Sequence, residues 1–499
     1  MKLPKDQSQK NKKEINLFAI STAKNTNQIL EELLNLSLGE IHLKIHFGDV
    51  SNQFKASSLV RMNNKKGTSG HFFQKNKNFY GFDYQLISSP HFKKDLEMFI
   101  DQLFRHSESY RYKSHNLQNL QDYLDYYYIL SDAVAELFVS NQINHVLFFN
   151  IPHLAYDTIV YQVAKALDIE ITIVTQSLIP NKFFSLKTIE NYGLLNQTKS
   201  LQKIKKIKLP KLNLFYMKKI KQEYEQNGNI NIRSLVNFIL YIIFKKPNIL
   251  FQPIYMWQII TRIKKIYNSF PRWRDPFANF FHTNELAYFE HLAEFENTKY
   301  DFNDKFVYFP LPMQPEMTTS AIGGVYRDQV LAIEELSKLL PDDIKIYVKE
   351  NPKQGSYARG PLFFHRISRI RSVVFVPSFA NTTKLLENSI FVATTTGTVG
   401  WEAICSGKSV LAFGSAWYRS FPGVTEFKKG ITFEKIKRNF PQKNILEFKF
   451  SNLMEHSHDG VVDRAYEHLV KNYNGKKNNL NTARVIKDLI FKIKKTTFT

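Results

Sequence analysis

The sequence predicts an α/β protein with two doubly wound parallel sheets, joined by a strongly basic helical segment. Short apolar runs alternate with helical periodicity on both sides of the middle of the chain, as in parallel sheets covered by helices. The 499 residues suffice for two or three domains, and 43% of them are hydrophobic. Cys405 is the single cysteine, which excludes a disulfide-bonded scaffold and any cysteine-based metal site.

The N-terminal half carries the pattern of a βαβ unit. Residues 154–168 have apolar side chains at helical spacing and lie between two short apolar runs, and residues 91–140 are also helical by periodicity. We therefore expect a Rossmann-like domain over residues 14–190, after a polar, disordered N-terminus at residues 1–13. No charged region followed by an apolar run opens the chain, so we expect a cytoplasmic protein. The strands predicted in this half are 14–21, 40–47, 145–150 and 170–176.

The C-terminal half predicts a second Rossmann-like domain, residues 301–450. Five apolar runs alternate with helical segments, and in such folds the ligand lies beyond the carboxyl ends of the strands, here in a cleft between the two domains. Helices are expected over residues 451–499. We expect His456-Ser457-His458-Asp459 to form an exposed loop, because no further metal ligands lie nearby in sequence. The predicted strands are 305–311, 343–350, 372–377, 389–395 and 409–414.

Residues 191–300 form a basic connector. The whole chain has 68 Lys and Arg against 45 Asp and Glu, a net charge of +23; residues 199–274 hold 17 of these basic residues and two acidic ones. The apolar runs 235–244 and 249–260 are shorter than the roughly 20 residues of a membrane-spanning helix. They suit either helices packed on the protein's own core or a segment lying on an anionic membrane surface. Nucleic acid is disfavoured, because no recognisable binding module is present.

Three loops that follow strands of the C-terminal half carry ligand-suited residues. Threonine hydroxyls and backbone N–H groups at the start of a helix can bind an anion without a metal, and Glu402 could accept hydrogen bonds from ribose hydroxyls. The alternative for this turn is an ordinary Thr398 cap with Glu402 in a capping box. We predict that ligand contacts come from Gln314, Lys349, Glu350, Asn351, Pro352, Thr395, Thr396, Gly397, Thr398 and Glu402.

Residues 300–415 resemble bacterial capsular polysaccharide biosynthesis proteins, the family that includes the Kdo transferases. The resemblance rests on the segments FVYFPLPMQPEMTTSAIGG, YRDQVLAIEELSKLLPDDIKIYVKENP and VATTTGTVGWEAICSGKSVLAFG. It implies a GT-B glycosyltransferase with the nucleotide sugar in the C-terminal half and the acceptor towards the N-terminal half. The family usually has His-Pro where this chain has Asn351-Pro352, and Asn cannot carry a proton charge at neutral pH.

Such a transferase needs a group that deprotonates the acceptor or attacks the anomeric carbon. His153, Asp157 and Glu316 are the catalytic candidates. The structural alternatives are a loop histidine at His153 and a carboxylate favoured by the helix dipole at Asp157. We expect no metal and no further cofactor, because basic residues and helix N-termini can stabilise the departing phosphate.

The resulting hypothesis is transfer of a sugar from a nucleotide sugar, with a CMP-linked 3-deoxy-ulosonate such as Kdo as one candidate donor. The acceptor would be a capsular polysaccharide or other surface glycan, or a lipid-linked one, reached by a protein peripheral at the inner membrane face. Capsule assembly or export proteins are the expected protein partners. The alternatives are a glycerophosphate transferase of the teichoic-acid type and a catalytically silent assembly or export scaffold.

Overall fold

The computed structural model divides into two compact units. The first unit contains the described residues from 14 to 191 together with 453–499, and the second contains those from 192 to 452. The C-terminal segment therefore completes the N-terminal unit instead of standing alone. The structure describes residues 14–48, 58–61, 78–82, 96–102, 120–195, 207–215, 236, 239–240, 243–244, 247–254, 256–257, 300–314, 316–352, 354, 359, 361–378 and 380–499.

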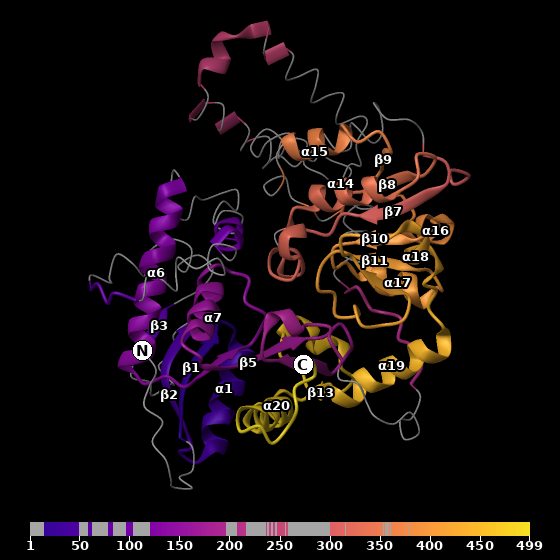
Figure 1. Ribbon diagram of the computed structural model, residues 1–499. Helices are drawn as coiled ribbons and strands as arrows, with labels where there is room; N and C mark the ends of the chain where they lie inside the picture. Colours follow the sequence, from indigo (N-terminus) through magenta and orange to yellow (C-terminus); the bar gives the residue numbers. More distant parts are fainter. Residues whose placement is uncertain are drawn as a thin grey trace. The chain divides into compact units, whose positions relative to one another are not determined.

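A seven-stranded sheet forms the centre of the first unit (Figure 1). Its order is β13-β6-β5-β4-β1-β2-β3, with β1 to β5 parallel to their neighbours and the pairs β5-β6 and β6-β13 antiparallel. The strands predicted from apolar runs are present; β3, β6 and β13 were not predicted. The strands are β1 (Ile15–Ser21), β2 (Ile41–Gly48), β3 (Ser58–Arg61), β4 (His145–Phe148), β5 (Glu170–Gln176), β6 (Lys182–Leu186) and β13 (His458–Asp459).

Helices cover both faces of this sheet. Helices α1 (Lys24–Ser37) and α20 (Gly475–Ile490) pack against one face, where the side chain of Ile486 is fully buried. Helices α6 (Leu120–Ser140) and α7 (Tyr156–Ala166) lie on the other face, where Phe138 of α6 meets Phe18 of β1 with ring centroids 5.1 Å apart. The short 3-10 helices of this unit are η1 (Ile189–Asn191) and η5 (Arg464–Leu469).

The expectation of an exposed loop at residues 456–459 is wrong. His458 begins β13, is 1% exposed, and its Nε2 lies 2.6 Å from the Ser185 hydroxyl of β6. Burial lowers the pKa of His458 to about 3, so the ring is neutral at physiological pH. β13 is an edge strand of two polar residues, of which His458 is buried and Asp459 is exposed, so it gives no hydrophobic signal in the sequence.

The second unit is built on a six-stranded, wholly parallel sheet in the order β12-β11-β10-β7-β8-β9. This sheet and the parallel part of the first confirm the predicted doubly wound α/β class. Helices α14 and α15 cover one face, and α16 and α17 the other. The strands are β7 (Phe306–Pro310), β8 (Lys345–Lys349), β9 (Val373–Val376), β10 (Val392–Thr394), β11 (Val410–Ala412) and β12 (Val424–Glu426). The helices are α13 (Met317–Ser320), η4 (Gly324–Arg327), α14 (Gln329–Leu339), α15 (Pro361–Ser368), α16 (Thr382–Asn388), α17 (Thr398–Cys405), α18 (Phe433–Arg438) and α19 (Lys443–His456).

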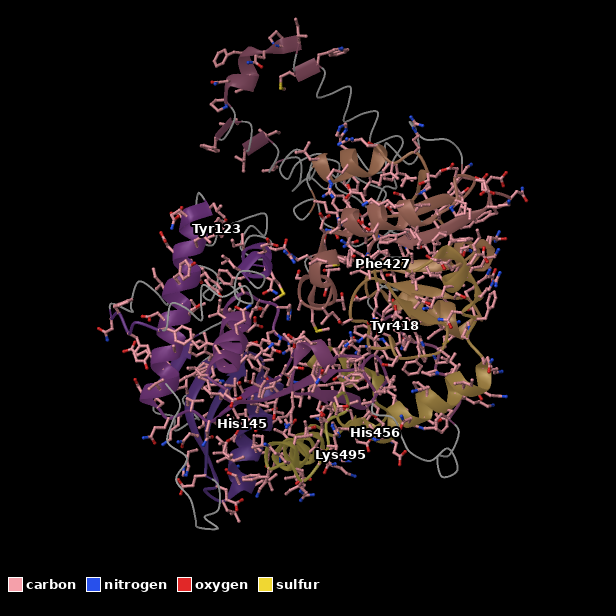
Figure 2. The ribbon with its side chains drawn as sticks, viewed as in Figure 1. Tyr123, His145, Tyr418, Phe427, His456 and Lys495 are labelled. Atoms are coloured by element: carbon pink, nitrogen blue, oxygen red, sulfur yellow. The ribbon has the colours of Figure 1, made fainter. Side chains whose placement is uncertain are left out.

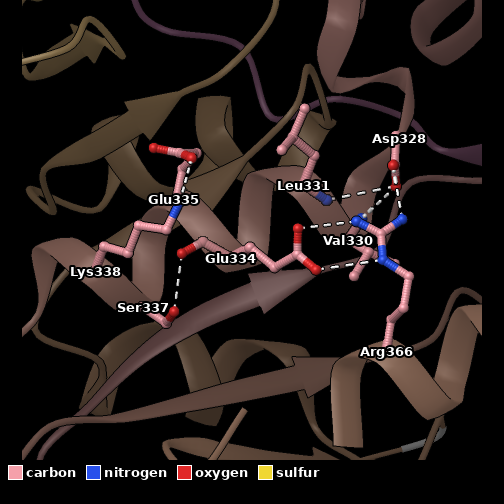
Figure 3. Close-up of polar contacts among 8 residues, drawn as sticks. All are labelled: Asp328, Val330, Leu331, Glu334, Glu335, Ser337, Lys338 and Arg366. Carbon is pink, nitrogen blue, oxygen red and sulfur yellow. Dashed lines mark hydrogen bonds and ion pairs between the residues drawn. The ribbon is translucent and has the colours of Figure 1, made fainter. Parts of the chain in front are cut away.

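An ion-paired brace joins α14 to α15 (Figure 3). Asp328 caps α14 by accepting the backbone N–H groups of Val330 and Leu331. Arg366 of α15 donates to Asp328 and to Glu334, at 2.8 Å each. Such half-exposed ion pairs contribute little stability individually, but this brace fixes the start of α14 directly after the loop that follows β7.

Most of the basic connector lies outside the described residues, including nearly all of its lysines. The described part contains residues 191–195 and 207–215, the 3-10 helix η2 (Pro247–Phe251) with a few residues on either side of it, and residue 300. Among the residues that the structure describes, no helix is long and apolar enough to cross a lipid bilayer.

The packing of α20 predicts a strong dependence of the first unit on its C-terminal segment. Replacing the fully buried Ile486 by alanine should lower the unfolding free energy by about 2–5 kcal/mol, because it leaves a cavity between α20, α1 and the sheet. Ile493→Ala is the control, since that side chain is 74% exposed and should change stability by less than about 0.5 kcal/mol. Urea denaturation measures both; equal effects would contradict the packing described.

Candidate functional site

The candidate site lies at the carboxyl edge of the sheet in the second unit. Because all six strands are parallel, the loops that follow β7, β8 and β10 leave the same edge. The predicted residues Gln314, Glu350–Pro352 and Thr395–Gly397 belong to these loops, Lys349 ends β8, and Thr398 and Glu402 lie in α17. The structure thus brings these candidates of the C-terminal half to one edge of the sheet.

Two glutamines join the loops after β7 and β8. The backbone N–H of Gln314 donates to the side-chain oxygen of Gln354 at 2.8 Å, and the side-chain amide of Gln354 returns a bond to the Gln314 carbonyl at 2.8 Å. The side-chain amide of Gln314 donates to the Arg327 carbonyl. Gln314 is 1% exposed, so its main role in this structure is to shape the loop.

A buried ion pair fixes the loop after β8. Glu350 and Arg359 are 1% and 3% exposed, and the guanidinium donates to the Glu350 carboxylate and to the Pro312 carbonyl of the loop after β7. The other carboxylate oxygen accepts the Asn351 backbone N–H at 2.6 Å. This arrangement presents Asn351 and Pro352, both partly exposed, beyond the end of β8.

Lys349 ties the ends of β8 and β9 together. Its ammonium group, on the last residue of β8, donates to the Ala380 carbonyl at 2.9 Å and to the Thr382 hydroxyl at 2.6 Å. Thr382 begins α16 and also hydrogen-bonds the buried Tyr308 hydroxyl. A buried cation held in this way adds positive charge to the edge of the sheet at a fixed position.

The turn after β10 is held from both sides and leads into α17. The Thr394 hydroxyl accepts the Gly397 N–H at 3.0 Å, and the Thr396 hydroxyl donates to the Thr318 carbonyl at 2.6 Å. The Thr395 hydroxyl is buried and has no hydrogen-bond partner among the described residues. The first N–H groups of α17, on Thr398 and Val399, have no partner within the helix, which makes this terminus suited to an anion.

The capping-box alternative for this turn is wrong. The N-cap of α17 is Gly397, without a side-chain cap, so Thr398 and Glu402 lie inside the helix. Tyr418, labelled in Figure 2, holds the terminus by donating to the Gly397 carbonyl. A Cβ atom on Gly400 would overlap the Tyr418 ring and hydroxyl. A glycine is therefore required at residue 400 by close packing.

Glu402 is a partly buried titratable group of this edge. Burial raises the pKa of its carboxyl, and the positive charges of Lys211 and Lys349 oppose the shift. A carboxyl in this setting can accept hydrogen bonds from ligand hydroxyls in either protonation state through its carbonyl oxygen. Glu316, the other acidic candidate, caps α13 and takes part in a capping box with Thr319.

In the first unit, His153 and Asp157 follow the carboxyl end of β4. Asp157, 6% exposed, accepts the backbone N–H groups of His153 at 3.1 Å and Leu154 at 2.7 Å. Burial is the largest influence on its carboxyl and raises the pKa. The His153 Nδ1 donates to the Ile151 carbonyl at 2.7 Å, which leaves Nε2 as the basic nitrogen of the neutral ring. Asp157 thus positions the loop that carries His153.

This loop also contains a strained turn. Ala155 has φ of 68°, and the Tyr156 N–H bonds to the Leu154 carbonyl at 2.9 Å across it. Gln102 supports the turn by accepting from the Ala155 N–H and the Thr158 hydroxyl. Positive φ at a residue other than glycine requires such support and is common near functional sites.

Sequence reasoning missed Gln354, Arg359 and Tyr418. Arg359 lies nine positions after Glu350, beyond any local spacing rule, and only the need to pair a buried carboxylate indicates such a partner. No three His, Cys, Asp or Glu side chains gather closely enough to hold a metal ion within the part of the chain that the structure describes.

Residues 285–458 match the family of capsule polysaccharide biosynthesis proteins. The family resemblance read from the sequence is confirmed over this segment, which contains every loop of the carboxyl edge described above. No curated protein matches the chain.

The solved structures that match this chain have low sequence identity to it and low TM-scores. A β-Kdo 2,4-transferase, KpsC, from Thermosulfurimonas dismutans is 12% identical with a TM-score of 0.26, covering 64% of this chain and 85% of its own. The β-Kdo 2,7-transferase of the same organism is 9% identical with a TM-score of 0.31, covering 74% of this chain and 92% of its own. A glycosyltransferase from Rickettsia africae is 11% identical with a TM-score of 0.23, covering 96% of this chain and 99% of its own. Similarities this low carry no argument about activity.

Glu402 predicts a pH dependence of stability with a definite sign. A carboxyl whose pKa is higher in the folded state than in the unfolded state holds its proton more tightly when folded, so stability falls as pH rises through the folded pKa. Glu402→Gln removes this titration. The unfolding free energy of the wild type minus that of Glu402→Gln should therefore decrease between pH 4 and pH 8, as measured by urea denaturation at each pH. A difference that stays constant or increases would contradict the burial of this carboxyl.

Proposed function

We propose that this protein is a glycosyltransferase of capsule polysaccharide biosynthesis that transfers a sugar from a nucleotide sugar to a growing glycan. The observation that carries the proposal is the family match at residues 285–458. This segment supplies the carboxyl-edge loops of a parallel sheet, where ligands of such folds bind. A CMP-linked 3-deoxy-ulosonate is the first donor to test, because the resemblance is to the family that contains Kdo transferases.

In the proposed complex, the donor phosphate lies at the N-terminus of α17. The N–H groups of Thr398 and Val399 would donate to its oxygens, and the helix dipole would stabilise the charge that develops as the nucleotide departs. The buried ammonium of Lys349 contributes positive charge to the same edge. We propose that these groups stabilise the leaving phosphate without a metal. Glu402 is the proposed acceptor for ribose hydroxyls.

The proposed acceptor side is the loop after β4 in the first unit. The Nδ1–H bond of His153 to the Ile151 carbonyl fixes the neutral tautomer in which Nε2 can take a proton from an acceptor hydroxyl. Asp157 holds that loop through two backbone N–H groups. Asn351 adjoins the donor site and can donate and accept hydrogen bonds, but it cannot act as a charged acid at neutral pH.

A titration of donors tests this proposal. We expect the wild type to bind one class among CMP-, UDP- and GDP-sugars in the calorimeter. Glu402→Ala should weaken that binding by about tenfold or more, because hydrogen bonds to a charged group contribute about 1.5–3 kcal/mol each. Glu387→Gln, an exposed acidic position on α16, is the control and should leave binding unchanged.

The remaining outcomes identify the alternatives. Binding of CDP-glycerol in place of every nucleotide sugar would indicate a glycerophosphate transferase. Donor binding without turnover on any glycan acceptor would favour a silent scaffold, for which Asn351 is the motivating residue. No binding of any of these compounds would exclude the proposed function.

We also propose that the connector holds the enzyme at an anionic membrane surface, next to a lipid-linked acceptor. Nine large apolar side chains described between residues 236 and 257 are each at least 45% exposed, which is unusual for apolar side chains so close in sequence. Met256 is partly buried. Basic residues of the same segment complement anionic lipid headgroups. These exposed side chains are Val236, Ile239, Leu240, Ile243, Phe244, Leu250, Phe251, Ile254 and Trp257.

Vesicle sedimentation tests the membrane contact. The wild type should sediment with vesicles containing phosphatidylglycerol but not with neutral phosphatidylcholine vesicles. Replacing Lys203, Lys205, Lys206 and Lys208 by glutamine should move most of the protein to the supernatant, since each basic residue contributes about 1 kcal/mol near an anionic surface. A matched control replaces Lys384, Lys443, Lys471 and Lys476, which are exposed elsewhere. A wild type that stays in the supernatant with anionic vesicles would refute the contact.

A further inference from the structure

A basic pocket lies beyond the carboxyl end of β12, the edge strand of the second sheet. Its volume is about 350 Å³, near the lower end of the roughly 300–1,000 Å³ that is usual for small-molecule sites. The lining residues come from β12 itself, from the turn that follows it and from the start of α18, and Arg419 comes from the segment between β11 and β12. None of these residues belongs to the donor loops described above.

The charges that line this pocket are mostly positive. Arg419, Lys428, Lys429 and Lys435 line it, and Glu426 is the one acidic residue among the lining residues. The Glu426 carboxylate lies 3.8 Å from the Arg419 guanidinium, at the far limit of an ion pair. The side chain of Arg419 is 10% exposed, and burial lowers its pKa, so a second anion in the pocket would stabilise this charge.

Hydrogen bonds connect this pocket to the proposed donor loops. Arg419 donates to the Ser415 hydroxyl at 3.1 Å, and the neighbouring Gly414 N–H bonds to the Thr395 carbonyl at 2.9 Å. Phe427, directly after β12, stacks on Phe413 with ring centroids 4.7 Å apart, and Figure 2 labels its place in this unit. β12 is two strands from β10, a separation of roughly 10 Å.

We propose that this pocket binds a carboxylate or phosphate group of the acceptor glycan. The inference rests on the proposed function and adds a substrate class to it: an acidic saccharide. The donor phosphate already has the N-terminus of α17, so a second cationic site at the sheet edge suits the other substrate. The three exposed lysines are point charges that can bind a carboxylate or a phosphate without strict geometry. The position of the pocket at the edge of the sheet allows a long glycan chain to continue into solvent.

Calorimetry with defined saccharides tests the assignment. The probes are tetragalacturonate, its fully methyl-esterified and uncharged form, inorganic phosphate, and the nucleotide sugar that the wild type binds. We expect tetragalacturonate to bind the full-length wild type and the ester not to bind. Lys428→Gln combined with Lys429→Gln should weaken tetragalacturonate binding by about fivefold or more, with nucleotide-sugar binding unchanged within about twofold.

The matched control is Lys305→Gln combined with Lys443→Gln. Lys305 lies before the amino end of β7, at the opposite edge of the sheet, and its ion pair with Asp343 is exposed. This control changes the net charge equally and should leave both titrations unchanged. If the control weakened tetragalacturonate binding equally, only net charge would matter, and the proposed binding at the pocket would be refuted.

Four further results would also overturn it: no binding of tetragalacturonate, equal binding of the uncharged ester, inorganic phosphate binding as tightly as the tetramer, or an equal loss of nucleotide-sugar binding in the pocket variant. The last would assign the pocket to the donor. Failure of the proposed function is a different result, in which the wild type binds no nucleotide sugar whatever the saccharide titration shows.

Discussion

The parallel arrangement of the six strands in the second unit is the constraint on which the candidate site depends. It places the loops after β7, β8 and β10 at one edge, and each loop is then fixed by a bond that crosses to its neighbour. Arg359 is central to this network, because it pairs with Glu350 after β8 and also donates to the Pro312 carbonyl after β7. Removing one partner of such a buried pair typically costs about 3–5 kcal/mol, so the loop positions and the stability of the unit are linked.

This network explains how polar loops can form a preorganised site. Lys349, Gln314 and Glu350 are buried and bonded to the protein, so they set positions, whereas Asn351 and Pro352 are partly exposed at the end of β8. The same division of roles occurs in the first unit, where Asp157 holds the loop that presents His153. Binding to preformed N–H groups avoids the cost of ordering them when the ligand arrives.

The sequence allowed much of the fold, but less of the site, to be predicted. Buried parallel strands such as β8 and β10 are continuous apolar runs, and these were identified with the helices between them. β12 was not, because three half-buried residues, Val424–Glu426, form no apolar run. The contacts of Arg359 and Tyr418 could not be predicted, since they join residues that only the folded sheet brings together. Glu402 lies beyond the carboxyl end of β10, as predicted, but the alternative of a Thr398 cap is wrong because Gly397 is the N-cap of α17.

The central claim is that a nucleotide sugar binds at the carboxyl edge of the second sheet. A crystal structure of the protein with the nucleotide sugar that it binds in solution tests this claim most directly. We expect a donor phosphate oxygen at about 2.7–3.2 Å from the backbone nitrogen of Thr398 or Val399, with the ribose within hydrogen-bond distance of Glu402. A nucleotide bound away from the N-terminus of α17 would contradict the account.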